Sequence, residues 1–214
     1  RTIDRVREKT GGEVSVHGEV FSPFTHFMEL IGYENALMSL IMDPDKAHAL
    51  LDRLTVSSVT WAVAQAERGV DAVLMSSALA GGPLLSPDMY REFVLPYERR
   101  VTEAVRATGV PIYTHTCGSI GDRLELMVET GTMGIDTLDP PPLGNTELAD
   151  AKARIGDKVF IKGNMNSVAL LQFQSKEQVI EHATERIRLG MPDGGYILST
   201  ACSVSPKVEP WKLE

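Results

Sequence analysis

The sequence alternates regularly between short apolar runs and longer amphipathic stretches, and this alternation constrains the fold more than any other feature. The apolar runs have strand length, whereas the longer stretches show helical spacing and helix-start signals such as the Ser-Pro-Asp at 86–88. Strands are expected at 14–20, 72–76, 111–115, 134–138, 159–162 and 196–200. Helices are expected at 25–42, 44–68, 86 to about 108, 121–130, 146–154 and 175–189. Because helical crossovers connect parallel strands, the pattern predicts an α/β fold with a parallel sheet.

Polar and reactive residues follow five consecutive strands of this pattern. They are Ser76, Ser77, His115, Cys117, Asp139, Asn164 and Cys202. In a (β/α)8 barrel the loops after the strands form the catalytic face, whereas a doubly wound sheet binds ligands only where the strand order reverses. Candidates after so many consecutive strands favour the TIM barrel.

The chain length bears on how much of a barrel is present. The 214 residues fall short of the roughly 250 that a complete barrel typically needs. The sequence does not begin with Met, and it stops at 211–214 where a helix is expected to start. We therefore expect a single barrel domain over 1–214, with about six of eight strands, that lacks the first two strands and the last helix.

Composition excludes several classes of protein. The formal net charge of -8 argues against a nucleic-acid binder, which would normally present a basic face. No apolar run reaches the roughly 18 residues of a membrane helix, and the polar first residues do not resemble a secretory signal. Only two cysteines are present, which favours a reducing, cytoplasmic setting over a disulfide scaffold.

The segment 113–118 (YTHTCG) places an imidazole and a thiol two positions apart at the end of an expected strand. In extended backbone, His115 and Cys117 point the same way, so both can bind one ion. Cys202 follows another strand, and the strand ends of a closed barrel converge. One nitrogen and two sulfurs suit Zn²⁺ with a fourth position open for exchange. The alternative is that both cysteines are small core residues and His115 is a hydrogen-bonded histidine.

Other residues after the strands are candidates for further roles. Asp139 is a candidate fourth ligand that leaves when a substrate thiol arrives, or else a turn aspartate before a proline. Glu19, at the end of the first strand, is a second candidate carboxylate, because its charge would be costly to bury without a metal or cation. We expect Ser76, Ser77 and Asn164 to contact substrate, with capping of strand ends and loop backbone as the alternative.

Three segments resemble the uroporphyrinogen decarboxylase superfamily. Residues 18–25 (GEVFSPFT) are similar to its G-x-x-x-x-P-F-T segment, 85–97 (LSPDMYREFVLPY) to its S-P-x-x-Y-x-x-F-x-x-P-Y helix, and 162–164 (KGN) to its G-N strand end. The resemblance covers nearly the whole chain and implies a (β/α)8 barrel whose first two strands precede this sequence.

The two branches of the superfamily imply different chemistry. The decarboxylase branch uses no metal, but Cys202 stands where it has a late histidine and Glu29 where it has a tyrosine. The cobamide-dependent methyltransferase branch binds zinc through an H-x-C pair and a late cysteine, which His115, Cys117 and Cys202 match. Cobalamin-independent methionine synthase, a related barrel, adds a carboxylate to a similar set, which supports Asp139.

The resemblance therefore implies a zinc-dependent methyltransferase. It would move a methyl group between a corrinoid protein, as partner, and a thiol or other small acceptor, with the zinc-bound thiolate as nucleophile. Two alternatives stay open at this point. One is a metal-free decarboxylase of a tetrapyrrole or related acid, and the other is a non-catalytic binding barrel.

Overall fold

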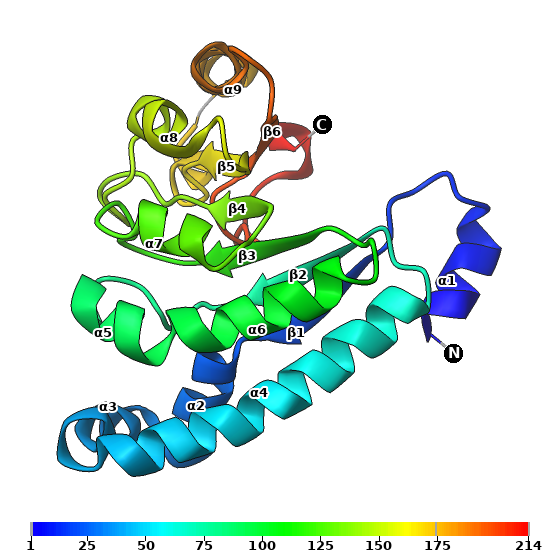
Figure 1. Ribbon diagram of the computed structural model, residues 1–214. Coiled ribbons are helices and arrows are strands. Elements are labelled where there is room, and N and C mark those ends of the chain that lie inside the picture. Colours follow the sequence, from blue (N-terminus) through cyan, green and yellow to red (C-terminus); the bar gives the residue numbers. More distant parts are fainter. Residues whose placement is uncertain (1, 174, 214) are drawn as a thin grey trace.

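A single sheet of six parallel strands organises the chain (Figure 1). The computed structural model describes residues 2–173 and 175–213. The strands are β1 (His17–Phe21), β2 (Ala72–Ser76), β3 (Ile112–Thr116), β4 (Gly134–Thr137), β5 (Phe160–Met165) and β6 (Tyr196–Thr200). Each strand pairs with the next one along the chain, in the order β1-β2-β3-β4-β5-β6. The predicted parallel α/β fold is confirmed, and the unbroken order is that of a barrel wall rather than of a doubly wound sheet.

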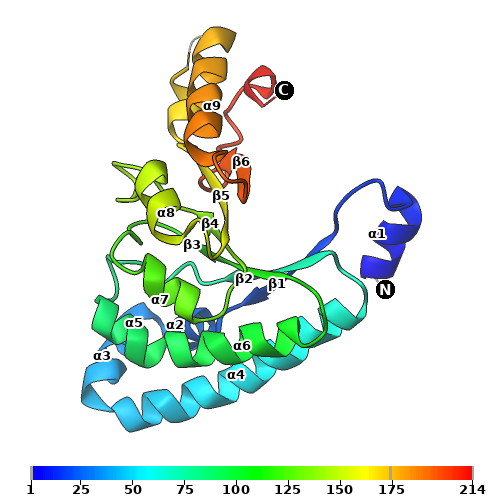
Figure 2. The ribbon, with the colours of Figure 1, turned by 45° about the horizontal axis from the view of Figure 1, so that its top comes forward.

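Helices connect the strands and cover one face of the sheet, except for the first, which precedes β1. They are α1 (Thr2–Thr10), α2 (Pro23–Ile31), α3 (Tyr33–Met42), α4 (Pro44–Glu67), α5 (Pro87–Phe93), α6 (Leu95–Arg106), α7 (Leu124–Glu129), α8 (Leu148–Ile155) and α9 (Lys176–Gly190), with short 3-10 turns η1 (Ala169–Leu171) and η2 (Pro210–Lys212). Helices α4 and α6 lie side by side along this face (Figures 1 and 2). None of the helices in the described part of the chain is both long and apolar enough to cross a membrane.

Two predicted helices are each broken in two. Gly32 separates α2 from α3 with a φ of 80°, a conformation in the left-handed half of the map that glycine adopts readily. Val94 separates α5 from α6, and Pro96 stands in the first turn of α6, where its missing N–H costs no hydrogen bond. The predicted strand 14–20 begins three residues later, at His17. The periodic pattern continues across both breaks, but a glycine and a proline inside a helical pattern are break signals that our expectation did not use.

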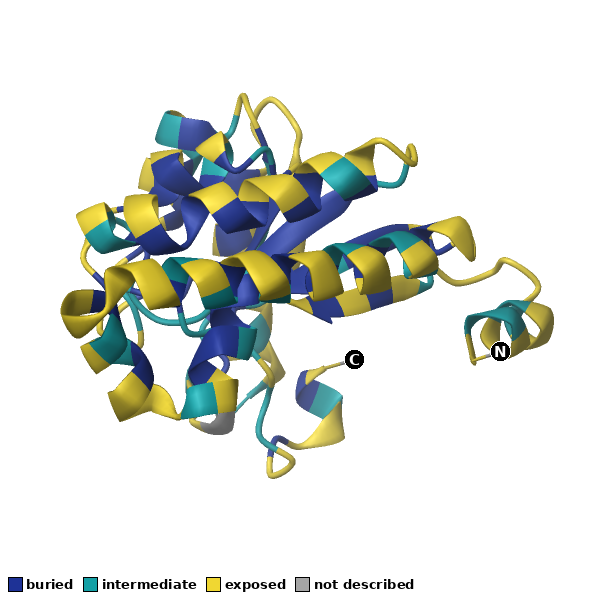
Figure 3. Ribbon diagram, turned by 60° about the horizontal axis from the view of Figure 1, so that its bottom comes forward, coloured by how far each residue is buried: buried dark blue, intermediate teal, exposed yellow. Residues whose placement is uncertain are grey.

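The apolar core lies between the sheet and its helices. Ile112 of β3 packs with Val101 and Val105 of α6 in one cluster, and all three side chains are fully buried. Figure 3 shows the consequence along α4 and α6, where buried residues face the strands and exposed residues face outward. Because side chains alternate along a strand, Tyr113 and His115 project from the opposite, concave face. The concave face is therefore where polar side chains gather.

Candidate metal centre

Strand register brings four polar side chains to one level of the sheet. Ser76 on β2 pairs with His115 on β3, His115 pairs with Asp136 on β4, and Asp136 pairs with Lys162 on β5. Neighbouring strands lie about 4.8 Å apart, so each side chain reaches the next across the ladder. Residues that lie up to 86 positions apart in the sequence, from Ser76 to Lys162, thus form one polar row across the sheet.

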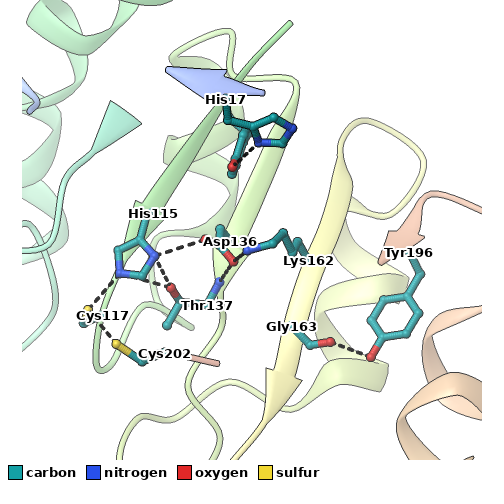
Figure 4. A network of polar contacts seen from close by, with 10 residues as sticks. His17, His115, Cys117, Asp136, Thr137, Lys162, Gly163, Tyr196 and Cys202 are labelled. Carbon is teal, nitrogen blue, oxygen red and sulfur yellow. Dashed lines mark hydrogen bonds and ion pairs between the residues drawn. The ribbon is translucent and has the colours of Figure 1, made fainter. Parts of the chain in front are cut away.

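Three potential metal-binding atoms meet beside this row, at the carboxyl ends of the strands. His115 Nε2 lies 3.1 Å from Cys117 Sγ, and Cys117 Sγ lies 3.8 Å from Cys202 Sγ (Figure 4). The nitrogen and the two sulfurs all lie within 4.8 Å of one another. Both cysteines are free thiols, and both are partly buried. The geometry thus brings together the three residues that the sequence analysis assigned to one metal.

The other side of the His115 ring is held by oxygen atoms. Nδ1 lies 2.7 Å from Thr137 Oγ1 and 3.2 Å from Asp136 Oδ2, while Asp136 Oδ1 accepts a hydrogen bond of 2.9 Å from Lys162 Nζ (Figure 4). Burial alone would raise the pKa of Asp136, but the hydrogen bonds from His115 and Lys162 hold it below its usual range. An ionised carboxylate only accepts, so the ring proton belongs on Nδ1 and Nε2 presents its lone pair to the sulfurs.

The charges around the two thiols help to decide whether a metal ion suits this site. Burial raises the pKa of Cys117 to about 12, and Cys202 and the carboxylates of Asp139 and Asp136 contribute in the same direction. The Cys117 thiol therefore stays protonated at neutral pH unless a cation is bound, since a coordinating cation deprotonates a thiol. Two sulfurs, one imidazole nitrogen presented by its partners, and excess negative charge nearby together suit Zn²⁺.

The candidate carboxylates lie in different surroundings. Asp139 is buried; its Oδ2 accepts a 2.7 Å hydrogen bond from Gly118 N, and its Oδ1 has no hydrogen-bond partner among the residues that the structure describes. It is not part of the three-residue donor group, although its charge acts on Cys117. Glu19 is exposed on β1 and lines the same concave hollow as His115. Both assignments stay predictions.

The predicted substrate-binding residues are divided between two environments. Ser76 lines the hollow, whereas the Ser77 hydroxyl donates to Glu98 in the buried layer behind the sheet. Asn164 is fully buried; its Nδ2 donates to Leu138 O at 3.0 Å, and its Oδ1 has no partner. These placements keep Ser76 in reach of a ligand in the hollow and give Ser77 and Asn164 contacts within the protein.

The hollow itself has a volume of about 400 Å³ and lies on the concave face. Its polar lining includes Glu19, Ser76, His115, Asp136, Lys162 and Cys202. A space of this size takes a small molecule. The donor group therefore borders a space that an acceptor can enter.

Sequence reasoning missed Asp136, Thr137 and Lys162. Asp136 and Lys162 each lie inside an apolar strand, and a charged residue in such a strand was a signal available in the sequence. That signal says only that each charge needs a partner. The partnership itself depends on register, which the sequence does not state.

A sequential parallel sheet with a donor cluster at its carboxyl end defines a barrel-type protein with a candidate metal centre. The family model described as uroporphyrinogen decarboxylase (URO-D) matches residues 1–214. The chain therefore belongs to the uroporphyrinogen decarboxylase family, as the three motifs indicated.

Relatives from both branches are similar to this chain. A methylated-thiol–coenzyme M methyltransferase of Methanosarcina mazei is 30% identical over 95% of this chain and 52% of its own length. A uroporphyrinogen decarboxylase of Shewanella amazonensis is 29% identical over 98% of this chain and 59% of its own. A methylcobamide:CoM methyltransferase of Methanosarcina barkeri is 26% identical over 95% and 57%. The chain thus spans between half and three-fifths of the length of these relatives.

A solved structure supports the fold. A methyltransferase from Methanosarcina mazei superimposes with a TM-score of 0.85 over 99% of this chain and 59% of that chain, at 24% sequence identity. At this identity the likeness concerns the fold, and the function is argued from the site.

Proposed function

We propose that this protein is a zinc-dependent methyltransferase that moves a methyl group between a corrinoid protein and a thiol or another small acceptor. The observation that carries the proposal is the donor group, in which His115 Nε2, Cys117 Sγ and Cys202 Sγ lie within 4.8 Å of one another. Three protein ligands with an exchangeable fourth position are typical of catalytic rather than structural zinc. Two of the similar proteins are named as methyltransferases that act with coenzyme M.

The residues of the site would divide the work as follows. His115, Cys117 and Cys202 would hold the ion, and Asp136 would keep the His115 ring in the tautomer that binds it. When bound, zinc would supply Lewis-acid stabilisation of the acceptor's thiolate, which is the nucleophile in such a transfer. The acceptor would occupy the hollow beside Ser76 and Lys162. When no acceptor is bound, Asp139 or Glu19 would provide a carboxylate for the ion.

A second candidate is metal-free decarboxylation of a tetrapyrrole or related acid. It is favoured by the similarity to uroporphyrinogen decarboxylases, which reaches 30% identity over 98% of this chain. Two positions count against it. Cys202 replaces the late histidine that the decarboxylase pattern implies, and Glu29, in place of a tyrosine, is exposed and accepts a hydrogen bond from Tyr33.

Metal content and transfer activity test the proposal together. Protein purified without added metal and dialysed is expected to retain about one zinc per chain and to demethylate methylcobalamin in the presence of coenzyme M or another small thiol. Cys202→Ser is expected to lose both properties while keeping its thermal midpoint close to that of the zinc-free wild-type protein. Ser203→Ala, which changes the adjacent residue of the same hollow, is the control and should keep both.

The outcome that contradicts the proposal is a folded wild-type protein without stoichiometric zinc. Release of CO₂ from uroporphyrinogen by that protein, unaffected by Cys202→Ser, would establish the second candidate instead.

A further inference from the structure

Thr137 has a backbone conformation that threonine rarely adopts. Its φ is 94°, and the next residue, Leu138, also has a positive φ, of 49°. A β-branched side chain at positive φ is strained, because its Cβ crowds the neighbouring backbone. Strain of this kind persists only where the surrounding structure holds it, and it often marks a functional site.

The strands on both sides hold Thr137 in this conformation. Thr137 pairs with Thr116 of β3 and with Gly163 of β5. A Cβ at position 163 would lie 2.6 Å from the Thr137 carbonyl oxygen, so this close approach needs a glycine there. The Thr137 N–H also donates to Asp136 Oδ1 at 2.9 Å. The conformation is therefore fixed from several directions.

The strained backbone places one functional atom. Thr137 Oγ1 lies 2.7 Å from His115 Nδ1, closer than the 3.2 Å of Asp136 Oδ2. Asp136 is shared with Lys162, so its carboxylate cannot turn fully toward the ring. Thr137 Oγ1 also lies 3.4 Å from His115 Nε2, so the hydroxyl contacts the ring at both nitrogens and restrains its rotation.

We propose that Thr137 is a positioning residue for the metal centre, whose hydroxyl contacts the His115 ring and sets its orientation. The inference rests on the proposed function, because it assigns the hydroxyl to zinc binding. The fold itself does not need it: glycine would adopt this backbone with less strain, and the hydroxyl makes its hydrogen bonds to His115.

Metal affinity separates this role from a structural one. Apo protein is titrated with zinc against a chromophoric chelator, and with Co²⁺ to record its thiolate charge-transfer and d–d bands. Thr137→Val is expected to lower zinc affinity about 10–100-fold, the usual loss when an outer-shell partner of a metal-bound histidine is removed. Its Co²⁺ bands should shift. Thr137→Ser keeps the hydroxyl and should restore both properties.

The matched control is Thr116→Val. Thr116 faces Thr137 across the ladder and is fully buried, and within 2–173 and 175–213 its hydroxyl has no hydrogen-bond partner. The same chemical change there is expected to leave zinc affinity and the Co²⁺ bands unchanged.

Thr137→Gly keeps the proposal testable if the valine variant does not fold. It relieves the strain but also removes a fully buried side chain and gives the unfolded chain more freedom, so the test in this variant is zinc affinity, which should fall, and not the thermal midpoint. Wild-type affinity in the valine or glycine variant, or equal losses in the serine and valine variants, would overturn the assignment. A wild-type protein that binds no zinc would instead overturn the proposed function, and this inference with it.

Discussion

At the scale of single residues, Asp136 explains how opposite charges are accommodated inside the sheet. Its side chain is only 7% exposed and lies between His115 Nδ1 and Lys162 Nζ. A buried carboxylate is costly without a cationic or hydrogen-bonding partner. Lys162 supplies the cation from the neighbouring strand, so the two residues depend on each other.

This dependence gives a prediction for Lys162→Met. Removing the ammonium leaves the Asp136 carboxylate with fewer partners, so the free energy of unfolding at pH 7 should fall by about 1–3 kcal/mol. The double variant with Asp136→Asn should lose less than the sum of the two single variants, because no uncompensated charge remains. Urea denaturation measures all three, with the exposed Lys158→Met as control. Additive losses would show that the two side chains do not interact.

The residues of the candidate site could be predicted only in part. His115 and Cys117 were identified because strand periodicity puts both on one face, and Cys202 because it also follows a strand. Thr137 was not identified, since no pattern in the sequence announces a positive φ at a threonine. Asp136 and Lys162 were missed because their pairing arises from the register of β4 and β5.

At the scale of elements, a buried carboxylate joins α6 to the end of β2. Glu98 is fully buried; its carboxylate accepts hydrogen bonds from the Ser77 hydroxyl and from Tyr90 OH at 3.1 Å. The Ser77 N–H in turn donates to His115 O at 2.8 Å. Helix α6 is thus linked to the strand that carries the candidate ligands.

The Glu98 carboxyl should make stability depend on pH. Burial raises its pKa to about 7 against the hydrogen bonds from Ser77 and Tyr90. The folded state therefore binds the proton more tightly than the unfolded chain, and this group lowers the free energy of unfolding as pH rises from about 4.5 to about 7. Relative to wild type, Glu98→Gln should gain on the order of 2–3 kcal/mol between pH 5 and pH 8.

Denaturant titrations at the two pH values measure this effect. Glu103→Gln, an exposed substitution on the same helix, should show the pH dependence of wild type. A parallel pH profile for Glu98→Gln would mean that Glu98 is already ionised at pH 5.

The elements themselves could be predicted well, and their ends less well. All six strands were expected because apolar runs of strand length are separated by helical patterns. The breaks at Gly32 and before Pro96 were not expected, although a glycine and above all a proline inside a helical pattern signal such breaks. The residue at which each helix ends depends in addition on packing against the sheet, which local pattern does not encode.

At the scale of the whole molecule, the edge strand β6 is more exposed than the strands in the centre of the sheet. Strand β6 pairs with β5 alone within the described residues, and Ile197 and Leu198 on it are 49% and 38% exposed. In the sheet centre, Ile135 and Ile161 are fully buried. That residues 1–214 form a single barrel domain stays a prediction.

Zinc should stabilise this edge if it binds as proposed. At a free concentration about 100-fold above Kd, binding only to the folded state adds about 2.7 kcal/mol to the free energy of unfolding. We expect a higher thermal midpoint with zinc than with EDTA, and a zinc-dependent slowing of amide exchange that is larger in β6 than in β3. Cys202→Ser should abolish both differences. Equal protection of β6 with and without zinc would contradict the expectation.

The distance along the chain between the two sulfurs has a mechanical consequence. Cys117 and Cys202 are 85 positions apart, one after a central strand and the other after the last strand. An ion shared by them would act as a reversible cross-link between the loop after β3 and the loop after the edge strand β6. Binding of the ion would then be a late step of folding, and its loss would let β6 unfold locally before the rest of the sheet unfolds.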